Sequence, residues 1–274
     1  FRLTIILFAV LSVLIFWFTF ASTRERVRPA PHQSSVREDM SALIRNASWV
    51  ILVGTGILVV VGLVARFASI VFYIKYYVQD QGLLVFWIFD RTAVLTSCGL
   101  IGQLVGALMT PALAARFEKH HLIVGMNLLH AVLLGVCFLV PPEQFELIVV
   151  LHSLGILTFG VIITLLFSMY TDCAEYGEWK TGKNTAGLTV SASMFSLKFG
   201  SAVGGALPGF ILAGFGFVAN EVQTDMAITG IRLMFNILPA VFFLAGGLLM
   251  LFYRIDRETL SRVEAELHDR RGTG

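Results

Sequence analysis

The chain has 274 residues, of which 57% are hydrophobic and only 14% are charged, against about 25% charged in a typical soluble protein. The mean hydropathy is +0.81, and the formal net charge of +2 is too small to indicate nucleic-acid binding. The composition therefore predicts an integral membrane protein and argues against a soluble globular domain. The three cysteines, Cys98, Cys137 and Cys173, have neither zinc nor disulfide spacing, so we expect buried thiols.

Seven apolar segments approach or exceed the length that crosses a bilayer. In chain order they cover residues 3–22, 49–77, 92–115, 122–140, 147–170, 187–217 and 231–253. Lysine and arginine alternate between the connectors: 78–90, 141–146 and 218–230 contain none, whereas the other connectors and the tail are basic. By the positive-inside rule we expect the basic connectors and the C-terminal tail on the cytoplasmic side of the membrane, which we expect to be a bacterial inner membrane.

The longest connector, 23–48, separates one apolar segment from a group of six. This arrangement is typical of the midpoint of a two-bundle transporter. Since the chain starts at Phe1 without a signal peptide, we expect it to begin within such a protein. We expect a last helix of the first bundle at 1–22, a central loop at 23–48, a complete six-helix bundle at 49–253 and a cytoplasmic tail at 254–274.

Two cytoplasmic pieces have the pattern of amphipathic helices. Residues 35–46 begin with a capping-box spacing at Ser35 and Glu38, and Val36, Met40, Leu43 and Ile44 form an apolar stripe. In the tail, Leu260, Val263 and Leu267 share a face, with Glu258/Arg262 and Glu266/Arg270 at four-residue spacing. Both helices could be plain surface helices or regulatory ones.

Lys198 is the most informative residue, because it lies in the middle of the apolar segment 187–217. It is about 16 Å from the start of that segment, whereas a lysine stem reaches only about 6 Å. An ammonium group at that depth costs at least about 2.5–3.5 kcal/mol. A carboxylate, a water-filled cavity or a bound ligand must compensate, which points to transport; a structural ion pair is the alternative.

The same segment offers further candidates. Ser193, Met194 and Leu197 are expected on the side of Lys198, where they could line the same cavity. The pairs Gly200/Gly204 and Gly205/Gly209 have the spacing that allows helix backbones to approach closely.

An acidic cluster ends the segment before it. Asp172, Glu175 and Glu178 are followed by Lys180 and Lys183. Carboxylates at a helix C-terminus oppose the helix dipole, so helix stability does not explain them. The cluster could pair with basic residues of the opposite bundle and close the inner side of a cavity, or it could belong to a solvated loop.

The remaining polar residues of the apolar segments have structural explanations. Arg66 and Lys75, near Tyr73, Tyr76 and Tyr77, are interpreted as snorkelling cations in an interfacial aromatic belt. A second set, expected to make hydrogen bonds between helices, comprises Asn127, His130 and His152. The sequence shows no metal cluster, nucleotide-binding loop or nucleophile–base pair, so we do not expect an enzyme or a resident cofactor.

The run from Asp172 to Lys183, followed by Lys198 within Phe195-Ser-Leu-Lys-Phe-Gly200, resembles the glycoside–pentoside–hexuronide:cation symporters, the melibiose-permease relatives of the major facilitator fold. The resemblance covers essentially the whole chain, as helices six to twelve. It implies an all-α major facilitator fold and a sugar and a coupling cation (sodium or proton) as partners. Asn184 departs from the basic residue that the family has there.

The resemblance also implies roles for particular residues. Lys198 corresponds to a lysine implicated in coupled cation and sugar binding, and Ser193 and Met194 to sugar-facing positions. The inner-gate positions are Asp172, Glu175 and Glu178, with Lys180 and Lys183. The family's cation ligands belong to the first bundle, which we expect to lie outside this chain. An amphiphile or lysolipid carrier of the same fold and a truncated, non-transporting membrane protein remain alternatives.

Overall fold

The computed structural model describes residues 2–23, 36–79, 90–182 and 186–272, and the side chains of 2, 36–39, 42, 186 and 270–272 are not described. The chain divides into two compact units, Phe1–Val36 and Arg37–Gly274. Lys183 and Ser35 therefore lie outside the described residues.

The first unit contains α1 (Arg2–Ser22), which matches the expected apolar segment. Its apolar side chains are exposed within the unit; Leu3 and Phe20, for example, are each 82% exposed. A helix that is apolar on all sides needs lipid or other helices around it. The length and composition of α1 are those of a membrane-spanning helix.

The regular elements in the described part of the second unit are all helices. Its elements are α2 (Val36–Arg45), α3 (Ala47–Phe72), η1 (Tyr73–Val78), α4 (Arg91–Arg116), α5 (Lys119–Leu139), α6 (Phe145–Thr181), α7 (Ala186–Gly214), α8 (Asp225–Arg232), η2 (Leu233–Ile237), α9 (Leu238–Met250) and α10 (Arg257–Gly272). In the described chain, α1 and six helical stretches of this unit are long and apolar enough to cross a membrane, which confirms seven spans.

Two segment boundaries differ from the sequence analysis. The helix expected at 147–170 continues to Thr181, so most of the expected polar connector is helical. The last span begins at Asp225 rather than at residue 231, because α8, η2 and α9 form one continuous rod. Hydropathy marks where the apolar residues stop, whereas a helix continues as long as its backbone hydrogen bonds do.

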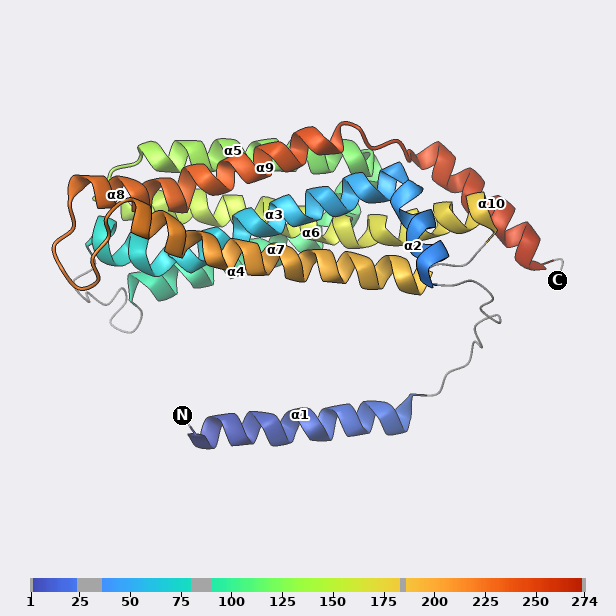
Figure 1. Cartoon of the computed structure of the whole chain (residues 1–274), viewed down its shortest axis with the longest axis horizontal. Helices are drawn as coiled ribbons and strands as arrows, with labels where there is room; N and C mark the ends of the chain where they lie inside the picture. The colour runs from blue at the N-terminus through green and yellow to red at the C-terminus, as the bar shows by residue number, and fades with distance from the viewer. Residues whose placement is uncertain (1, 24–35, 80–89, 183–185, 273–274) are drawn as a thin grey trace. The chain divides into compact units, whose positions relative to one another are not determined.

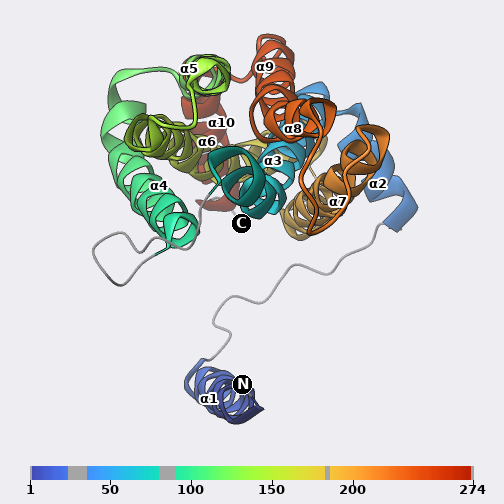
Figure 2. The ribbon, with the colours of Figure 1, turned by 90° about the vertical axis from the view of Figure 1, so that its left-hand side faces the viewer.

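The six spans of the second unit pack side by side along one axis (Figure 1). Seen along that axis, α4 and α7 lie on opposite flanks with α3 and α6 between them (Figure 2). Helix α4 packs on α6, α7 packs on α3, and α5 and α9 complete the bundle against α6 and α3. The unit therefore has two distinguishable ends, the α10 end, with α2 and the C-terminus of α6, and the α8 end, with η1.

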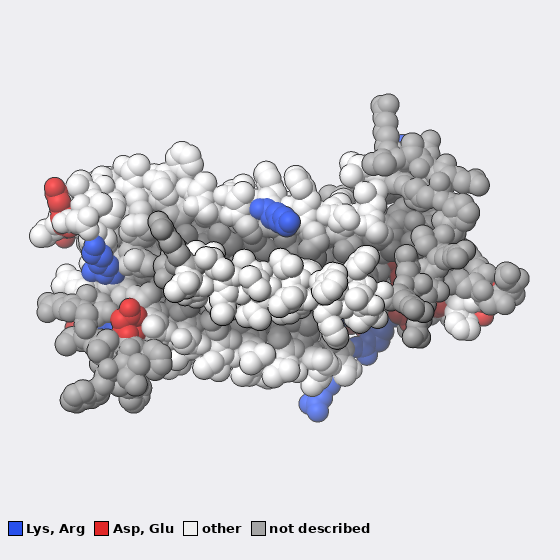
Figure 3. Space-filling model, turned by 90° about the horizontal axis from the view of Figure 1, so that it is seen from below, with Lys and Arg blue, Asp and Glu red and all other residues white. Residues whose placement is uncertain are grey.

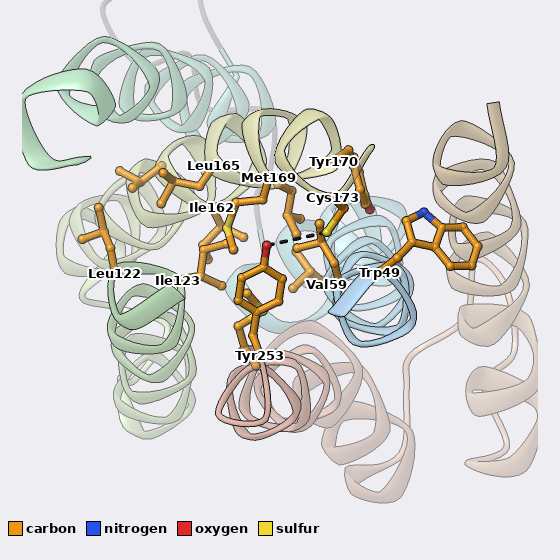
Figure 4. Packing of buried hydrophobic residues seen from close by; sticks show 14 of the residues in the cluster. Trp49, Val59, Leu122, Ile123, Ile162, Leu165, Met169, Tyr170, Cys173 and Tyr253 are labelled. Carbon is orange, nitrogen blue, oxygen red and sulfur yellow. Dashed lines mark hydrogen bonds between the residues drawn. The ribbon is translucent and has the colours of Figure 1, made fainter. Parts of the chain in front are cut away.

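A buried hydrophobic cluster joins α3, α5 and α6 near the α10 end (Figure 4). Trp49 enters it from α3, Ile123 from α5 and Met169 from α6. Tyr253, which follows α9, reaches the same cluster, with its hydroxyl 3.6 Å from the Cys173 sulfur. Burial raises the pKa of the Tyr253 phenol, so this side chain stays neutral in the core.

The thiols are placed largely as expected. Cys137 and Cys173 are buried, and Cys98 is half-buried. Cys173 differs in one respect, since it lies on helix α6 rather than in a polar connector.

Glycines allow the closest helix contacts of the unit. A Cβ atom at Gly106 of α4 would collide with the Leu157 carbonyl of α6, and one at Gly160 of α6 would collide with the Gln103 carbonyl of α4. On α7, Gly200 and Gly204 face the backbone of α3 at Ile57 and Val61, as their spacing predicted.

Within the part of the chain that the structure describes, Gly205 and Gly209 do not bring α7 close to another helix backbone. An added Cβ at Gly205 would reach only a Val64 methyl at 4.0 Å, and one at Gly209 would meet nothing within 4 Å.

We expect Gly106→Ala to lower the free energy of unfolding by about 1–3 kcal/mol, because the obstacle is the backbone of Leu157, which cannot move aside as a side chain can. Thermal unfolding of the purified protein in detergent would measure the change. Gly209→Ala is the matched control, since it makes the same chemical change in open space. Equal behaviour of the two variants would contradict the close approach of α4 to α6.

The two expected amphipathic helices are both present. In α2, Leu43 is buried whereas Met40 and Ile44 are exposed, so only part of the expected stripe faces the unit. In α10, Val263 and Leu267 are buried, which confirms the predicted face.

Polar contacts fix α10 against α6. The Trp179 indole N–H donates to Glu266 Oε2 at 2.7 Å, and the Arg262 guanidinium lies 5.8 Å from the centre of the Trp179 ring. Asp256 caps the helix by accepting the Thr259 backbone N–H at 2.8 Å, and hydrogen bonding to Thr259 holds the pKa of this carboxyl below its usual range. The tail is therefore docked on the unit.

Candidate functional site

Lys198 lies midway along α7 and is exposed. It follows Ala186 by 12 residues, or about 18 Å of helix. Gly200, two residues further, faces α3, and a two-residue step turns the helix by about 200°. Lys198 therefore projects away from α3, and it makes no hydrogen bond or ion pair in the part of the chain that the structure describes.

The surroundings of Lys198 are apolar. Phe195 and Phe199 on the same helix are 70% and 52% exposed. In the space-filling view, the acidic side chains that can be seen lie toward the two ends (Figure 3). A cation on such a surface needs a partner that the described residues of its own unit do not supply.

The structure does not bring Ser193 to the face of Lys198. Ser193 is fully buried, and its hydroxyl donates to the Thr189 carbonyl one turn earlier at 2.7 Å. It belongs to the α3-facing stripe of α7, so the expectation of a shared face was wrong for this residue. Met194 is half-buried and lies one turn before Lys198, and it remains a candidate to line the same space.

The acidic cluster lies on the last turns of α6 at the α10 end. Asp172 forms an ion pair of 2.7 Å with Lys119, which also donates to the Ser168 hydroxyl at 2.9 Å. Glu175 and Glu178 are half-buried on the same helix, and exposed Lys180 has its ammonium 6.0 Å from the centre of the Tyr176 ring. Asp172 thus ties α6 to α5 within its own bundle.

Sequence reasoning misplaced Arg66. It was interpreted as a snorkelling cation, but the residue is 1% exposed. Its guanidinium donates to the Phe235 carbonyl at 2.5 Å and to Asn236 Oδ1 at 3.4 Å, and it lies 3.2 Å from His152 Nδ1. The Phe235 ring lies 3.9 Å beneath the guanidinium carbon, and Tyr73 stacks on that ring at 4.0 Å. Among the described residues no carboxylate pairs with Arg66.

The Arg66 cluster joins three spans at a π-helical turn. Arg66 comes from α3, His152 from α6, and Phe235 and Asn236 from η2. π-Helical turns are rare and occur often at functional sites. A signal was present in the sequence, since arginine, histidine and asparagine each interrupt an apolar segment, but only the packing shows that they meet.

The other polar interruptions agree in part with expectation. His152 contacts Arg66, and His130 of α5 lies 2.8 Å from the Thr158 hydroxyl of α6, as predicted for bonds between helices. Asn127 instead donates to the Ile123 carbonyl of its own helix. Lys75 lies at the α8 end, as expected, with its ammonium 2.9 Å from Asn220 Oδ1.

The described residues include no group of three or more histidine, cysteine, aspartate or glutamate side chains able to hold a metal ion. The charged residues that stand out in the described spans are two cations, Lys198 on an apolar helix face and Arg66 in the core of the bundle.

Comparison with known proteins identifies the class. Residues 1–257 match the family model described as MFS/sugar transport protein. The chain is 30% identical to a glucuronide carrier protein homolog of Escherichia coli (strain K12), over 97% of this chain and 57% of that protein. It is 31% identical to an isoprimeverose transporter of Lactiplantibacillus pentosus, over 92% of this chain and 51% of that protein.

A third relative is an inner membrane symporter of Escherichia coli (strain K12), 29% identical over 94% of this chain and 56% of that protein. The helical spans and these matches place the chain in the major facilitator class of membrane proteins. The chain belongs to the glycoside–pentoside–hexuronide:cation symporter family. It spans about half the length of these curated relatives.

Proposed function

We propose that this chain forms the second six-helix bundle of a symporter that moves a glycoside, pentoside or hexuronide together with sodium or a proton. The observation that carries the proposal is Lys198, an exposed cation in the middle of an apolar helix. Such a charge is costly in lipid and fits the wall of a polar cavity between two bundles. Family membership supports a sugar as the cargo.

In this proposal, Lys198 faces carboxylates of a first bundle, and α1 is the last helix of that bundle. Sugar and cation bind at mid-membrane depth, and the two bundles rock to expose the site to each side in turn. Met194 lines the cavity beside Lys198. Ser193 is buried and does not line the cavity; it contributes to the packing of α7 within its own bundle.

We assign the α10 end to the cytoplasm. The connectors at the α8 end, 78–90, 141–146 and 218–230, contain no lysine or arginine, and the positive-inside rule then places them outside. The inner gate would comprise the charged end of α6 and the residues just after it: Asp172, Glu175, Glu178, Lys180 and Lys183. Within it, Asp172 holds α6 to α5, and exposed Lys180 is placed to reach outward.

Uptake by the protein expressed from its complete reading frame would test this function. Membrane vesicles would be given a labelled glucuronide or isoprimeverose, with a sodium gradient, a proton gradient or neither. We expect accumulation of a sugar only with one of the two gradients. Transport of a lysolipid without sugar flux would overturn the proposal in favour of an amphiphile carrier, and a folded protein without flux would indicate a non-transporting one.

A further inference from the structure

A cavity of about 710 Å³ opens at the α10 end of the second unit. Its walls come from α2, the first turn of α3, the last turns of α6 and the segment after α9. Its lining includes Arg45, Ser48, Lys180 and Arg254. This volume is within the range of about 300–1,000 Å³ that small-molecule sites have.

The lining of the cavity is basic. It contains three cations, Arg45, Lys180 and Arg254, and among the described residues of the lining there is no aspartate or glutamate. All three cations are exposed, and none of them forms an ion pair in the described ranges of the chain. They converge from three different elements, so the positive charge of the cavity is a product of the fold and not of one basic stretch.

The N-terminus of α3 adds to this positive charge. Asn46 caps the helix, since its side-chain oxygen accepts a hydrogen bond from the Trp49 backbone N–H at 3.3 Å. The backbone N–H groups of Ala47 and Ser48 lie in the first turn, where a helix offers no carbonyl acceptor of its own. Such N–H groups and the helix dipole favour an anion. Ser48 is only 6% exposed, and its hydroxyl makes no hydrogen bond within the described part of the chain.

Helix α2 carries exposed apolar side chains as well as basic ones. Helix α2 supplies Ser41, Leu43 and Arg45 to the lining. Its side chains Met40 and Ile44 are exposed and do not belong to the lining. Apolar side chains beside basic ones are typical of helices that lie at a membrane surface. A basic pocket beside such a helix, at the end of the spans that we assign to the cytoplasm, is suited to a lipid headgroup.

We propose that this cavity binds a phosphate-bearing anion, with the phosphate of an anionic membrane lipid as its source. The phosphate is held by Arg45, Lys180 and Arg254 and accepts hydrogen bonds from Ser48 and the α3 N-terminus. The site joins α2 and the segment after α9 to α6. It is separate from Lys198 and does not depend on which sugar is carried.

Native mass spectrometry of the delipidated protein, expressed from its complete reading frame, would test the site. The protein would be offered phosphatidylglycerol or zwitterionic phosphatidylcholine, and in a third arm inorganic phosphate would compete at constant ionic strength. We expect retention of phosphatidylglycerol over phosphatidylcholine. Arg45→Gln and Arg254→Gln should each weaken that binding about fivefold, the effect of about 1 kcal/mol per basic residue near anionic lipid.

Arg116→Gln is the matched control, since it removes an exposed arginine at the same end of the unit that does not line the cavity. Ser48→Ala tests the α3 N-terminus without a change of charge and should also weaken binding, and thermal unfolding would verify that each variant is folded. Competition by phosphate that Arg45→Gln abolishes would support the site with a soluble anion as its source. Equal retention of both lipids, or an equal loss in Arg116→Gln, would overturn the proposal, whatever the outcome of sugar uptake.

Discussion

Replacing Lys198 with glutamine is expected to lower gradient-driven sugar uptake at least about 100-fold. Removing one member of a desolvated charge pair typically costs 2–5 kcal/mol, and about 2.7 kcal/mol corresponds to a factor of 100 in rate. The side chain is exposed on its own unit, so its loss leaves the packing of the bundle intact. Initial rates of uptake, normalised to the amount of protein in the membrane, would measure the effect.

Two variants sharpen this experiment. Lys198→Arg retains the charge and should retain part of the uptake, whereas a role in packing alone would not distinguish arginine from glutamine. Lys75→Gln removes an exposed lysine that lies at the α8 end, where water can solvate it, and should transport normally. Normal accumulation by Lys198→Gln would contradict the role assigned to this residue.

Replacing Arg66 with alanine is expected to lower the free energy of unfolding by roughly 3–5 kcal/mol. The change leaves a cavity over the Phe235 ring, where the guanidinium lay, and deprives the Phe235 carbonyl, Asn236 and His152 of their donor. Unsatisfied polar groups in a membrane bundle are expensive because no water replaces the lost partner. Thermal unfolding in detergent would measure the loss.

The interpretation of Arg66 as a snorkelling cation makes the opposite prediction. A snorkelling arginine would behave like Arg116, whose replacement with alanine should change stability by less than about 0.5 kcal/mol because it is exposed. A double-mutant cycle with His152→Ala would isolate the contact between α3 and α6, and a coupling energy near zero would contradict it.

The placement of the glycines and of Ser193 shows why helix faces were hard to predict. Gly200 and Gly205 both belong to four-residue spacings on α7, yet only Gly200 meets a neighbouring backbone. Periodicity shows which residues share a face but not what that face contacts. Ser193 was assigned to the cavity and is buried instead, because the rotation of α7 is set by helices distant in sequence.

The sequence by itself determined the number of candidate spans, their approximate limits, the charge asymmetry of the connectors and the presence of Lys198 midway along an apolar segment. The physical reason is that a bilayer demands about 20 apolar residues per helix and penalises each charge within it. These requirements apply to each helix separately, so a stretch of consecutive residues is enough to recognise them.

Only the tertiary structure decided which polar groups meet. It buried Arg66 against His152 and Asn236, joined Asp172 to Lys119 and gathered Arg45, Lys180 and Arg254 around one cavity. Each of these contacts joins residues of different elements, and its geometry depends on the rotation and close approach of whole helices. Close packing of side chains fixes that rotation, and no single segment contains it.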